Sequence, residues 1–342
     1  MGRETEIAWC DSTWSPVRGC TRVSRGCEHC YSELLCSRGL PNLKSPTTGE
    51  DFARKTPSGP RWTGRVELIE SQLEIPLHWR KPRRIFVNSM SDTFHEALPD
   101  EAIDRIFAVM ALCPQHTFMV LTKRPKRMQK WFAGCLVDGK LRGGLGKAVQ
   151  GICGGTYGGY AIEAFYKLQL AFKSWPWPLP NIQLGVSVED RSTLHRIDQL
   201  RETPAALRFL SLEPLLEDLG ELDLRGIGWC IVGGESGPGA RPCRVEWIRS
   251  VVKQCAAAGT SCFVKQLGSR AVSQCPSCDV RKVGPGGPGF CRFAQATRRT
   301  DGFDGHGDDG MLPVILRDRM GGDPSEWPER LRVRQMPGEV RR

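Results

Sequence analysis

Three cysteines near the N-terminus have the spacing of a metal-binding loop. Cys20, Cys27 and Cys30 lie in the sequence GCTRVSRGCEHCY, with the spacing C-x6-C-x2-C. Three thiolates on one short loop can bind three irons of a [4Fe–4S] cluster. The fourth iron then has no protein ligand, and an open metal position is where substrate or cofactor chemistry takes place.

The same spacing also fits a zinc site or three unrelated buried thiols. Zinc needs a fourth ligand, and His29 lies within the loop. The spacing alone does not separate zinc from an iron–sulfur cluster. Tyr31, directly after the last cysteine, and the order of the later elements favour the cluster.

Short apolar runs, each followed by a polar or glycine turn, predict the strands that position this loop. The segments between them include helical periodicity, most clearly at 99–110 and 245–255. Apolar strands that alternate with helices predict an α/β fold, a partial (β/α) barrel of about six to seven parallel strands. The predicted strands are 6–9, 84–89, 117–122, 182–187, 207–212, 228–233 and 261–265.

Polar residues follow six of these strands in succession. A single polar residue after a strand is ordinary capping. In a (β/α) barrel, however, the carboxyl ends of the strands meet at one mouth, so six in succession predict a functional site. The segments are 88–96, 122–125, 187–190, 211–214, 233–237 and 265–266.

Two regions interrupt this pattern. Residues from about 133 to 174 are rich in glycine and predict an insertion in a barrel domain of residues 1–268, either a lid or, more weakly, a phosphate-binding loop. Residues 269–342 predict an irregular basic extension. Its candidate zinc ligands, which fit a flexible tail equally well, are Cys275, Cys278, Cys291 and His306.

The composition is typical of a cytoplasmic globular protein. The 342 residues are 40% hydrophobic and 25% charged, without an apolar run of membrane-spanning length or an opening signal peptide. The fifteen cysteines are therefore expected to be reduced. The net charge of +10, with basic clusters at 80–84, 123–127 and 340–342, is compatible with a polyanionic partner. Cysteines expected in the core are Cys113, Cys230, Cys255 and Cys262.

The cysteine loop resembles that of radical S-adenosylmethionine (SAM) enzymes, most closely the spore-photoproduct-lyase-like branch. Residues 89–94 and the pair Thr122-Lys123 resemble segments that follow strands in that branch. About residues 5–268 resemble still more closely the three-Cys-motif proteins, a phage- and prophage-associated family of unassigned function. The segments that carry this second resemblance are 86–92, 184–189, 211–215 and 232–239.

Two features depart from the radical SAM pattern. The usual spacing is C-x3-C-x2-C, so the loop here is longer between Cys20 and Cys27. The usual Gly-Gly-Glu element follows the second strand, whereas residues 233–235 follow the sixth predicted strand. Ser89, Ser91 and Asp92 occupy the usual place of that element.

The resemblance implies a mechanism and residue roles. Cys20, Cys27 and Cys30 would ligate a [4Fe–4S] cluster whose open iron binds SAM, and a 5′-deoxyadenosyl radical would abstract hydrogen from the substrate. The residues implied to bind SAM are Tyr31, Ser89, Ser91, Asp92, Thr122, Lys123, Ser187 and Glu189. Those implied to face the substrate as catalytic residues, with a structural salt bridge or loop cap as the alternative role, are Glu213, Glu235 and Lys265.

The implied substrate is a nucleic-acid base or a nucleotide, since a flipped base could enter a barrel mouth. A peptide or a free metabolite stays open. The implied partners include an electron donor such as flavodoxin or ferredoxin, and no membrane. The alternative function is a non-catalytic Fe–S or zinc protein that binds nucleic acid, for which the affinity would depend steeply on salt.

Overall fold

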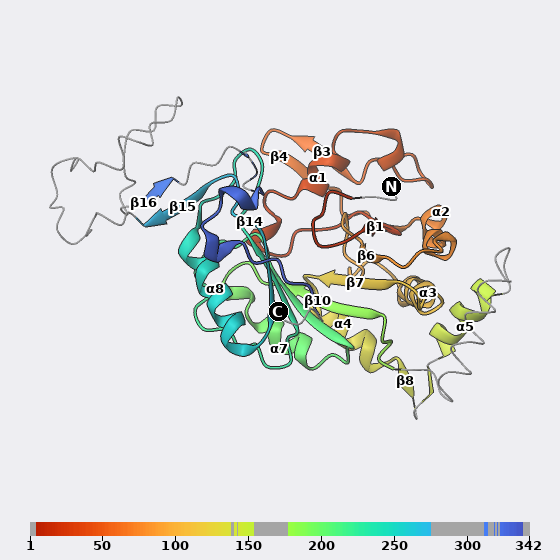
Figure 1. Cartoon of the computed structure of the whole chain (residues 1–342). Coiled ribbons are helices and arrows are strands. Elements are labelled where there is room, and N and C mark those ends of the chain that lie inside the picture. Colours follow the sequence, from red (N-terminus) through yellow and green to blue (C-terminus); the bar gives the residue numbers. More distant parts are fainter. Residues whose placement is uncertain are drawn as a thin grey trace. The chain divides into compact units, whose positions relative to one another are not determined.

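Seven parallel strands form a curled sheet, a partial (β/α) barrel, in the computed structural model (Figure 1). Strands that are neighbours in the sheet follow one another along the chain. Their order is β1 (Ser12–Trp14), β6 (Arg84–Val87), β7 (Thr117–Thr122), β10 (Ile182–Ser187), β11 (Leu207–Leu212), β12 (Trp229–Gly233) and β14 (Ser261–Gln266). The structure describes residues 5–137, 140–141, 143–153, 177–274, 311–313, 318, 320 and 322–337.

The first strand does not lie where the sequence predicted it. Residues 6–9 form no strand, and the sheet begins instead with β1, which pairs with β6. Trp9 is buried by edge-on packing against Phe86, with ring centroids 4.7 Å apart. The apolar run therefore serves side-chain packing rather than strand pairing. The other six predicted strands are confirmed to within two residues at each end.

Amphipathic helices follow the strands, as predicted for 99–110 and 245–255. Helix α3 (Asp100–Ala111) carries Asp100 and Glu101 in its first turn, where negative charge stabilises a helix N-terminus. The other helices are α1 (Tyr31–Cys36), α2 (Glu70–Leu73), α4 (Pro125–Ala133), α5 (Gly143–Cys153), α7 (His195–Arg201) and α8 (Val245–Ala258). Among the described residues, no helix has the length and apolar character needed to span a membrane.

Part of the glycine-rich region predicted as an insertion is helical. After a small hairpin of β8 (Leu136–Val137) and β9 (Lys140–Leu141), the glycines at 143–146 form the first turn of α5. Leu145, Val149 and Ile152 give this helix a buried face, and it packs against α3. The first glycine run is thus part of a helix rather than of a loop. The second run, at 154–160, lies outside the described residues.

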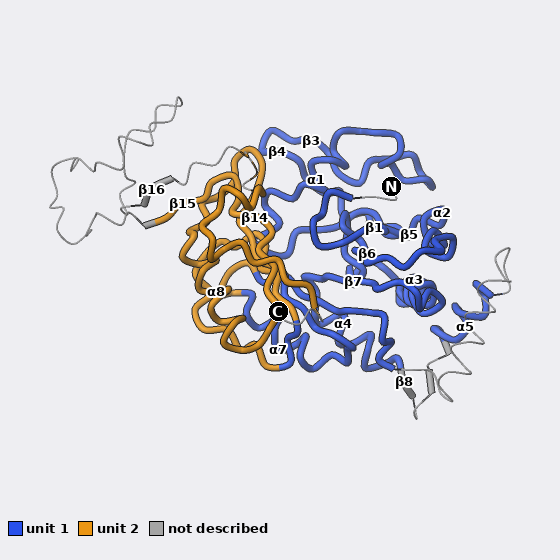
Figure 2. Tube along the Cα trace, in the orientation of Figure 1, with its two compact units in different colours: residues 1–188, 193–211, 226–228 blue, residues 189–192, 212–225, 229–342 orange. Residues whose placement is uncertain are grey.

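The chain divides into two compact units (Figure 2). Unit 1 comprises residues 1–188, 193–211 and 226–228, and unit 2 comprises residues 189–192, 212–225 and 229–342. The ends of β6 and β7, with the cysteine loop, lie in unit 1. Unit 2 runs across residue 268, where the sequence predicted that the barrel domain would end.

Described residues beyond 268 pair with other strands of unit 2. β15 (Ala271–Gln274) lies between β13 (Cys243–Arg244) and β16 (Met311–Pro313). Farther on, the N–H of Val264 donates to the Val333 carbonyl over 2.7 Å, and the N–H of Gln335 donates to the Cys262 carbonyl over 2.9 Å. The outer edge of β14 is thereby covered. The candidate zinc ligands Cys275, Cys278, Cys291 and His306 lie outside the described residues.

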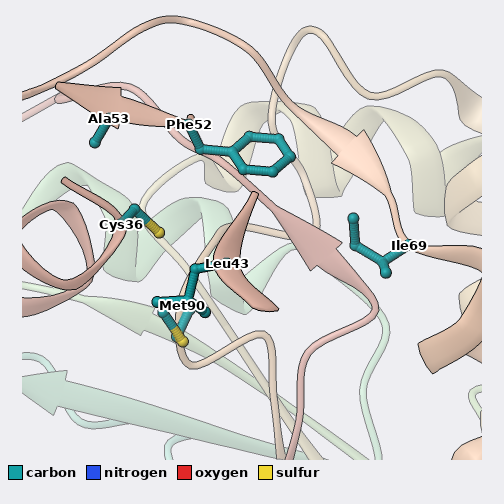
Figure 3. Packing of buried hydrophobic residues seen from close by; sticks show 6 residues of the cluster. All are labelled: Cys36, Leu43, Phe52, Ala53, Ile69 and Met90. Atoms are coloured by element: carbon teal, nitrogen blue, oxygen red, sulfur yellow. The ribbon is translucent and has the colours of Figure 1, made fainter. Parts of the chain in front are cut away.

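A small hydrophobic core in unit 1 supports the segment after the cysteine loop (Figure 3). Cys36, the last residue of α1, packs there close to the hairpin of β3 (Ala53–Thr56) and β4 (Gly59–Trp62). Met90 joins from the loop after β6, so this core ties α1 to a strand end. A further pair joins β2 (Val17–Arg18), which directly precedes the cysteines, to β5 (Glu67–Leu68). The core residues are Cys36, Leu43, Phe52, Ala53, Ile69 and Met90.

Candidate functional site

The three cysteines lie on one loop of unit 1, which begins directly after β2. Gly19 opens this loop with a φ of +88° and bridges to Ser91 in the loop after β6. A Cβ atom at Gly19 would lie 2.0 Å from the carbonyl oxygen of Arg65. Only glycine therefore lets the chain pass here, and its passage places the cysteines beside the end of β6.

The three thiols share one sheltered neighbourhood. Burial raises the pKa of Cys20 to about 12, although the nearby Arg124 guanidinium opposes this rise. Burial also raises the pKa of Cys30, against the backbone N–H groups at the start of α1. The charge of Cys27 adds to the rise at both positions, so its sulfur lies near the other two. Desolvated thiols of this kind are strong ligands once they lose their protons to a metal.

The three cysteines are the residues of this loop that could ligate a metal or a cluster. Within the described ranges, no group of three or more His, Cys, Asp or Glu side chains is placed closely enough to hold one metal ion. A zinc site needs its ligands on one ion, whereas a [4Fe–4S] cluster takes each thiolate on a different iron. The loop offers one buried and two half-buried thiols, which are soft ligands of the kind that such a cluster takes.

Residues predicted to bind SAM gather around this loop. The hydroxyl of Tyr31, directly after the last cysteine, donates to the carbonyl of Ser89, and Ser32 donates to the same oxygen over 3.4 Å. The hydroxyl of Ser91 donates to the Val17 carbonyl over 2.8 Å. Tyr31, Ser89 and Ser91 therefore join the cysteine loop to the end of β6.

Asp92 connects the ends of β6 and β7. One carboxylate oxygen accepts from the Thr122 hydroxyl over 2.7 Å and from the Phe94 N–H over 2.9 Å. The other accepts from the Lys123 N–H over 3.0 Å and from Arg124 over 3.1 Å. Four bonds from the protein occupy this buried carboxylate, so Asp92 shapes the site rather than presenting a free oxygen.

The sequence did not single out Arg124, which is the best-connected side chain of this site. It belongs to the segment 123–127, predicted as a surface basic cluster, yet its side chain is only 3% exposed. It reaches Cys20, Thr21 and Glu96 as well as Asp92. The one sequence signal was its place directly after a strand end, in the predicted segment 122–125.

A second ion pair, in which the carboxylate is buried and the guanidinium is partly exposed, also holds the loop. Arg22 lies between the first two cysteines, and its Nε donates to Glu33 of α1 over 2.9 Å. The same carboxylate accepts from the backbone N–H of Trp62 over 2.7 Å. Glu33 is almost fully buried, so the loop and the β3–β4 hairpin are fastened to one point.

Ser187 ends β10 and Glu189 lies two residues beyond it, but the two belong to different units. Ser187 is buried, and it lies one residue beyond Val186, the partner of Thr122 in the neighbouring strand. Its backbone carbonyl accepts from Arg196 over 2.8 Å. Glu189 is also buried but belongs to unit 2. The structure therefore brings Ser187, but not Glu189, into unit 1 with the other predicted SAM-binding residues.

The three predicted catalytic residues lie in unit 2 and form two separate ion pairs. Lys265 Nζ lies 3.2 Å from the carboxylate of Glu213. Glu235 is held by Arg241 through two side-chain hydrogen bonds of 2.9 and 2.6 Å. Glu235 is thus the more firmly fastened carboxylate, whereas the pair of Glu213 and Lys265 is partly exposed.

The Gly-Gly sequence before Glu235 has a packing role. A Cβ atom at Gly234 would lie 2.2 Å from the carbonyl oxygen of Leu267. The backbone after β12 therefore approaches the backbone after β14 too closely for any side chain. This close approach, within unit 2, accounts for the glycine.

The described basic clusters make many contacts within the chain. Arg83 stacks over Trp79 at 5.1 Å, and Arg84 pairs with Asp11 at 3.4 Å. In the cluster 123–127, Arg124 is buried and Arg127 pairs with Asp100. Residues 340–342 lie outside the described residues. Contacts within the chain therefore occupy part of the positive charge that the sequence assigned to a polyanion-binding surface.

A family model described as "protein of unknown function (DUF5131)" matches residues 4–311. The match includes the cysteine loop and the ion pairs of unit 2. No curated protein and no solved structure matches the chain.

Proposed function

The chain belongs to the DUF5131 family, whose description assigns no function, and we propose that it is a radical SAM-type enzyme. The observation that carries the proposal is the loop of Cys20, Cys27 and Cys30, fastened against the ends of β6 and β7. When bound, a [4Fe–4S] cluster and SAM would supply a 5′-deoxyadenosyl radical able to abstract hydrogen from an unactivated carbon. The resemblance to the spore-photoproduct-lyase-like branch and to the three-Cys-motif proteins supports the same function.

The residues of unit 1 divide into ligands, walls and contacts. The three cysteines hold the cluster. Ser91, Asp92 and Thr122 build the wall, because their side chains are engaged in the hydrogen bonds described above. The contacts we assign to the polar groups of SAM are Ser89, Lys123 and Ser187. For Tyr31, whose hydroxyl is bonded to the Ser89 carbonyl, we assign a packing contact of the ring. We assign Glu189, which belongs to unit 2, no contact with SAM.

We assign the substrate to the residues of unit 2. Glu213 and Lys265 form a partly exposed pair of an acceptor and a donor, which can contact the polar edge of a nucleic-acid base or a nucleotide. We assign a positioning role to Glu235, which is fixed by Arg241 and holds the loop after β12 in place. The net charge of +10 favours such an anionic substrate.

The surface at the cysteine loop suits a protein electron donor such as flavodoxin or ferredoxin. Exposed large apolar side chains on a soluble protein mark candidate contact surfaces. In the part of the chain that the structure describes, four of the five such residues fall on the loop or shortly after it: Val23, Tyr31, Leu34 and Leu40. A reduced donor and free thiols both fit the cytoplasm.

Anaerobic reconstitution with iron and sulfide tests the proposal. The expected result is a brown protein with about four irons per chain that, with dithionite, cleaves SAM to 5′-deoxyadenosine. The nucleoside is measured by mass spectrometry, with and without oligonucleotides. A loaded cluster that yields no 5′-deoxyadenosine contradicts the radical mechanism. Zinc, no colour and a salt-dependent affinity for nucleic acid would support the non-catalytic binding protein instead.

A further inference from the structure

Arg124 links the cysteine loop to the rest of unit 1. It stands between β7 and α4, and its guanidinium is directed at the residues that open the loop. Nη2 donates to the backbone carbonyl of Thr21 over 3.0 Å and to the Thr21 hydroxyl over 2.8 Å. Nη1 lies 3.7 Å from the sulfur of Cys20, within the range of an N–H···S hydrogen bond. One side chain therefore contacts both the first cysteine and the residue after it.

Two carboxylates also hold the guanidinium. Nη1 lies 3.1 Å from Asp92, and Nε lies 2.7 Å from Glu96. Burial alone would lower the pKa of Arg124, but Asp92, Cys20 and Glu96 together raise it. The group is therefore charged at every physiological pH, and its planar fork is held in one orientation.

A fixed cation beside a cluster sulfur has a predictable electronic effect. Each electron added to an iron–sulfur cluster increases the negative charge on its sulfurs. Hydrogen bonds and positive charge at those sulfurs stabilise the reduced state more than the oxidised state, which raises the reduction potential. Nη1 carries two hydrogens, so it can donate to the Cys20 sulfur and to Asp92 together, while Nε donates to Glu96.

We propose that Arg124 is a positioning residue that orients Cys20 for cluster binding and raises the reduction potential of the cluster. This inference rests on the proposed function, because it needs a cluster on the three cysteines. It goes beyond that function by assigning control of the potential to one side chain outside the cysteine loop. The alternative is a purely structural ion pair, which would alter folding but not the potential.

The test compares the midpoint potentials of reconstituted variants by titration with dithionite, followed by electron paramagnetic resonance. Arg124→Gln removes the charge, and Arg124→Lys keeps the charge without the fork. Arg127→Lys is the matched control, because Arg127 lies in α4 and pairs with Asp100. In Arg124→Gln we expect the equilibrium constant for one-electron reduction to fall about tenfold, which is about 59 mV. The midpoint potential of Arg124→Lys should lie between those of Arg124→Gln and the wild-type protein.

A double variant guards against misfolding. Arg124→Gln leaves Asp92 buried without its cation, which can unfold the protein. Asp92→Asn with Arg124→Met removes both charges, so the net charge of the site stays the same. A lower potential in this double variant then reports the lost contact at the sulfur. The circular dichroism spectrum and the thermal unfolding of each variant show whether it folds.

Each outcome bears on one hypothesis. Variants that fold and load iron fully but keep the wild-type potential overturn the role of Arg124. Variants that fold but lose iron, while Arg127→Lys retains it, support the orientation of Cys20. If wild-type protein takes up no cluster, the proposed function fails and this inference falls with it, whereas an unchanged potential in a loaded variant overturns this inference alone.

Discussion

Arg22 and Glu33 tie the middle of the cysteine loop to the helix that follows it. The Nε of Arg22 donates to the carboxylate of Glu33 over 2.9 Å, and that carboxylate is almost fully buried. With Arg124 at Cys20, this pair fastens the loop at two points. The loop is therefore held in place by charged side chains other than the cysteines.

Glu33→Gln is expected to loosen the loop. Arg22 donates to one oxygen of Glu33 and the Trp62 N–H donates to the other, so the amide must turn its NH2 group toward one of these donors. The donor left unpaired should cost about 1–3 kcal/mol of unfolding free energy. Urea unfolding and the rate of iron loss to a chelator measure the effect. Glu50→Gln, which removes a surface partner of Arg65, should cost less than about 1 kcal/mol. Equal losses in both variants would contradict the proposed tether.

Alanine substitution of each motif cysteine should abolish cluster binding. Cys20→Ala, Cys27→Ala and Cys30→Ala each remove a ligand, so iron content after reconstitution should fall to background. Cys36→Ala is the matched control, since Cys36 packs among apolar side chains and burial raises its pKa to about 11. Loss of iron in Cys36→Ala would mean that a fourth thiolate closes the site, against an open iron.

Gly19→Ala should destabilise the protein more than Gly39→Ala. Both glycines have positive φ, which costs alanine about 1–2 kcal/mol. At Gly39 the added methyl group meets nothing within 4 Å, whereas at Gly19 it would meet the Arg65 carbonyl. The difference in urea midpoint between the two variants isolates the effect of that close approach. Identical midpoints would show that the loop passes elsewhere.

Because of His116, the unfolding free energy should decrease as the pH falls below neutral. Burial lowers its pKa, against the opposing backbone groups of Pro76 and Trp79. The unfolded chain binds a proton near its ordinary pKa of about 6.5, whereas the folded chain binds it only at lower pH. The unfolding free energy should therefore decrease as the pH falls from about 6.5 toward the folded pKa. In His116→Asn this decrease should be smaller, and an unchanged slope would refute the assignment.

The sheet could be predicted from the sequence because its strands are buried on both faces. Their continuous apolar runs identify them without any knowledge of the fold, and six of seven were correct. The first strand failed because Ser12, Thr13 and Trp14 form a short and mixed segment, while the apolar residues before it pack without pairing. Pairing depends on the partner strand, which local composition does not encode.

The site was only partly visible in the sequence. Cysteine spacing and the residues after β6 and β7 identified the loop and its wall. Arg124 and Arg22 were not identified because each stands among other basic residues, and only the folded backbone brings Asp92 or Glu33 to meet them. The separation of Glu213, Glu235 and Lys265 into two ion pairs likewise depends on contacts between distant strands.

The return of residues 333–335 to β14 has a practical consequence for shortened versions of the protein. A chain cut after residue 274 would keep all seven strands of the sheet yet bare the backbone of β14, whose N–H and C=O groups now meet Val333 and Gln335. Such an open border is a template on which another molecule can add its own strand, and it promotes aggregation. A shortened version that stays soluble must therefore keep residues 333–335 on β14.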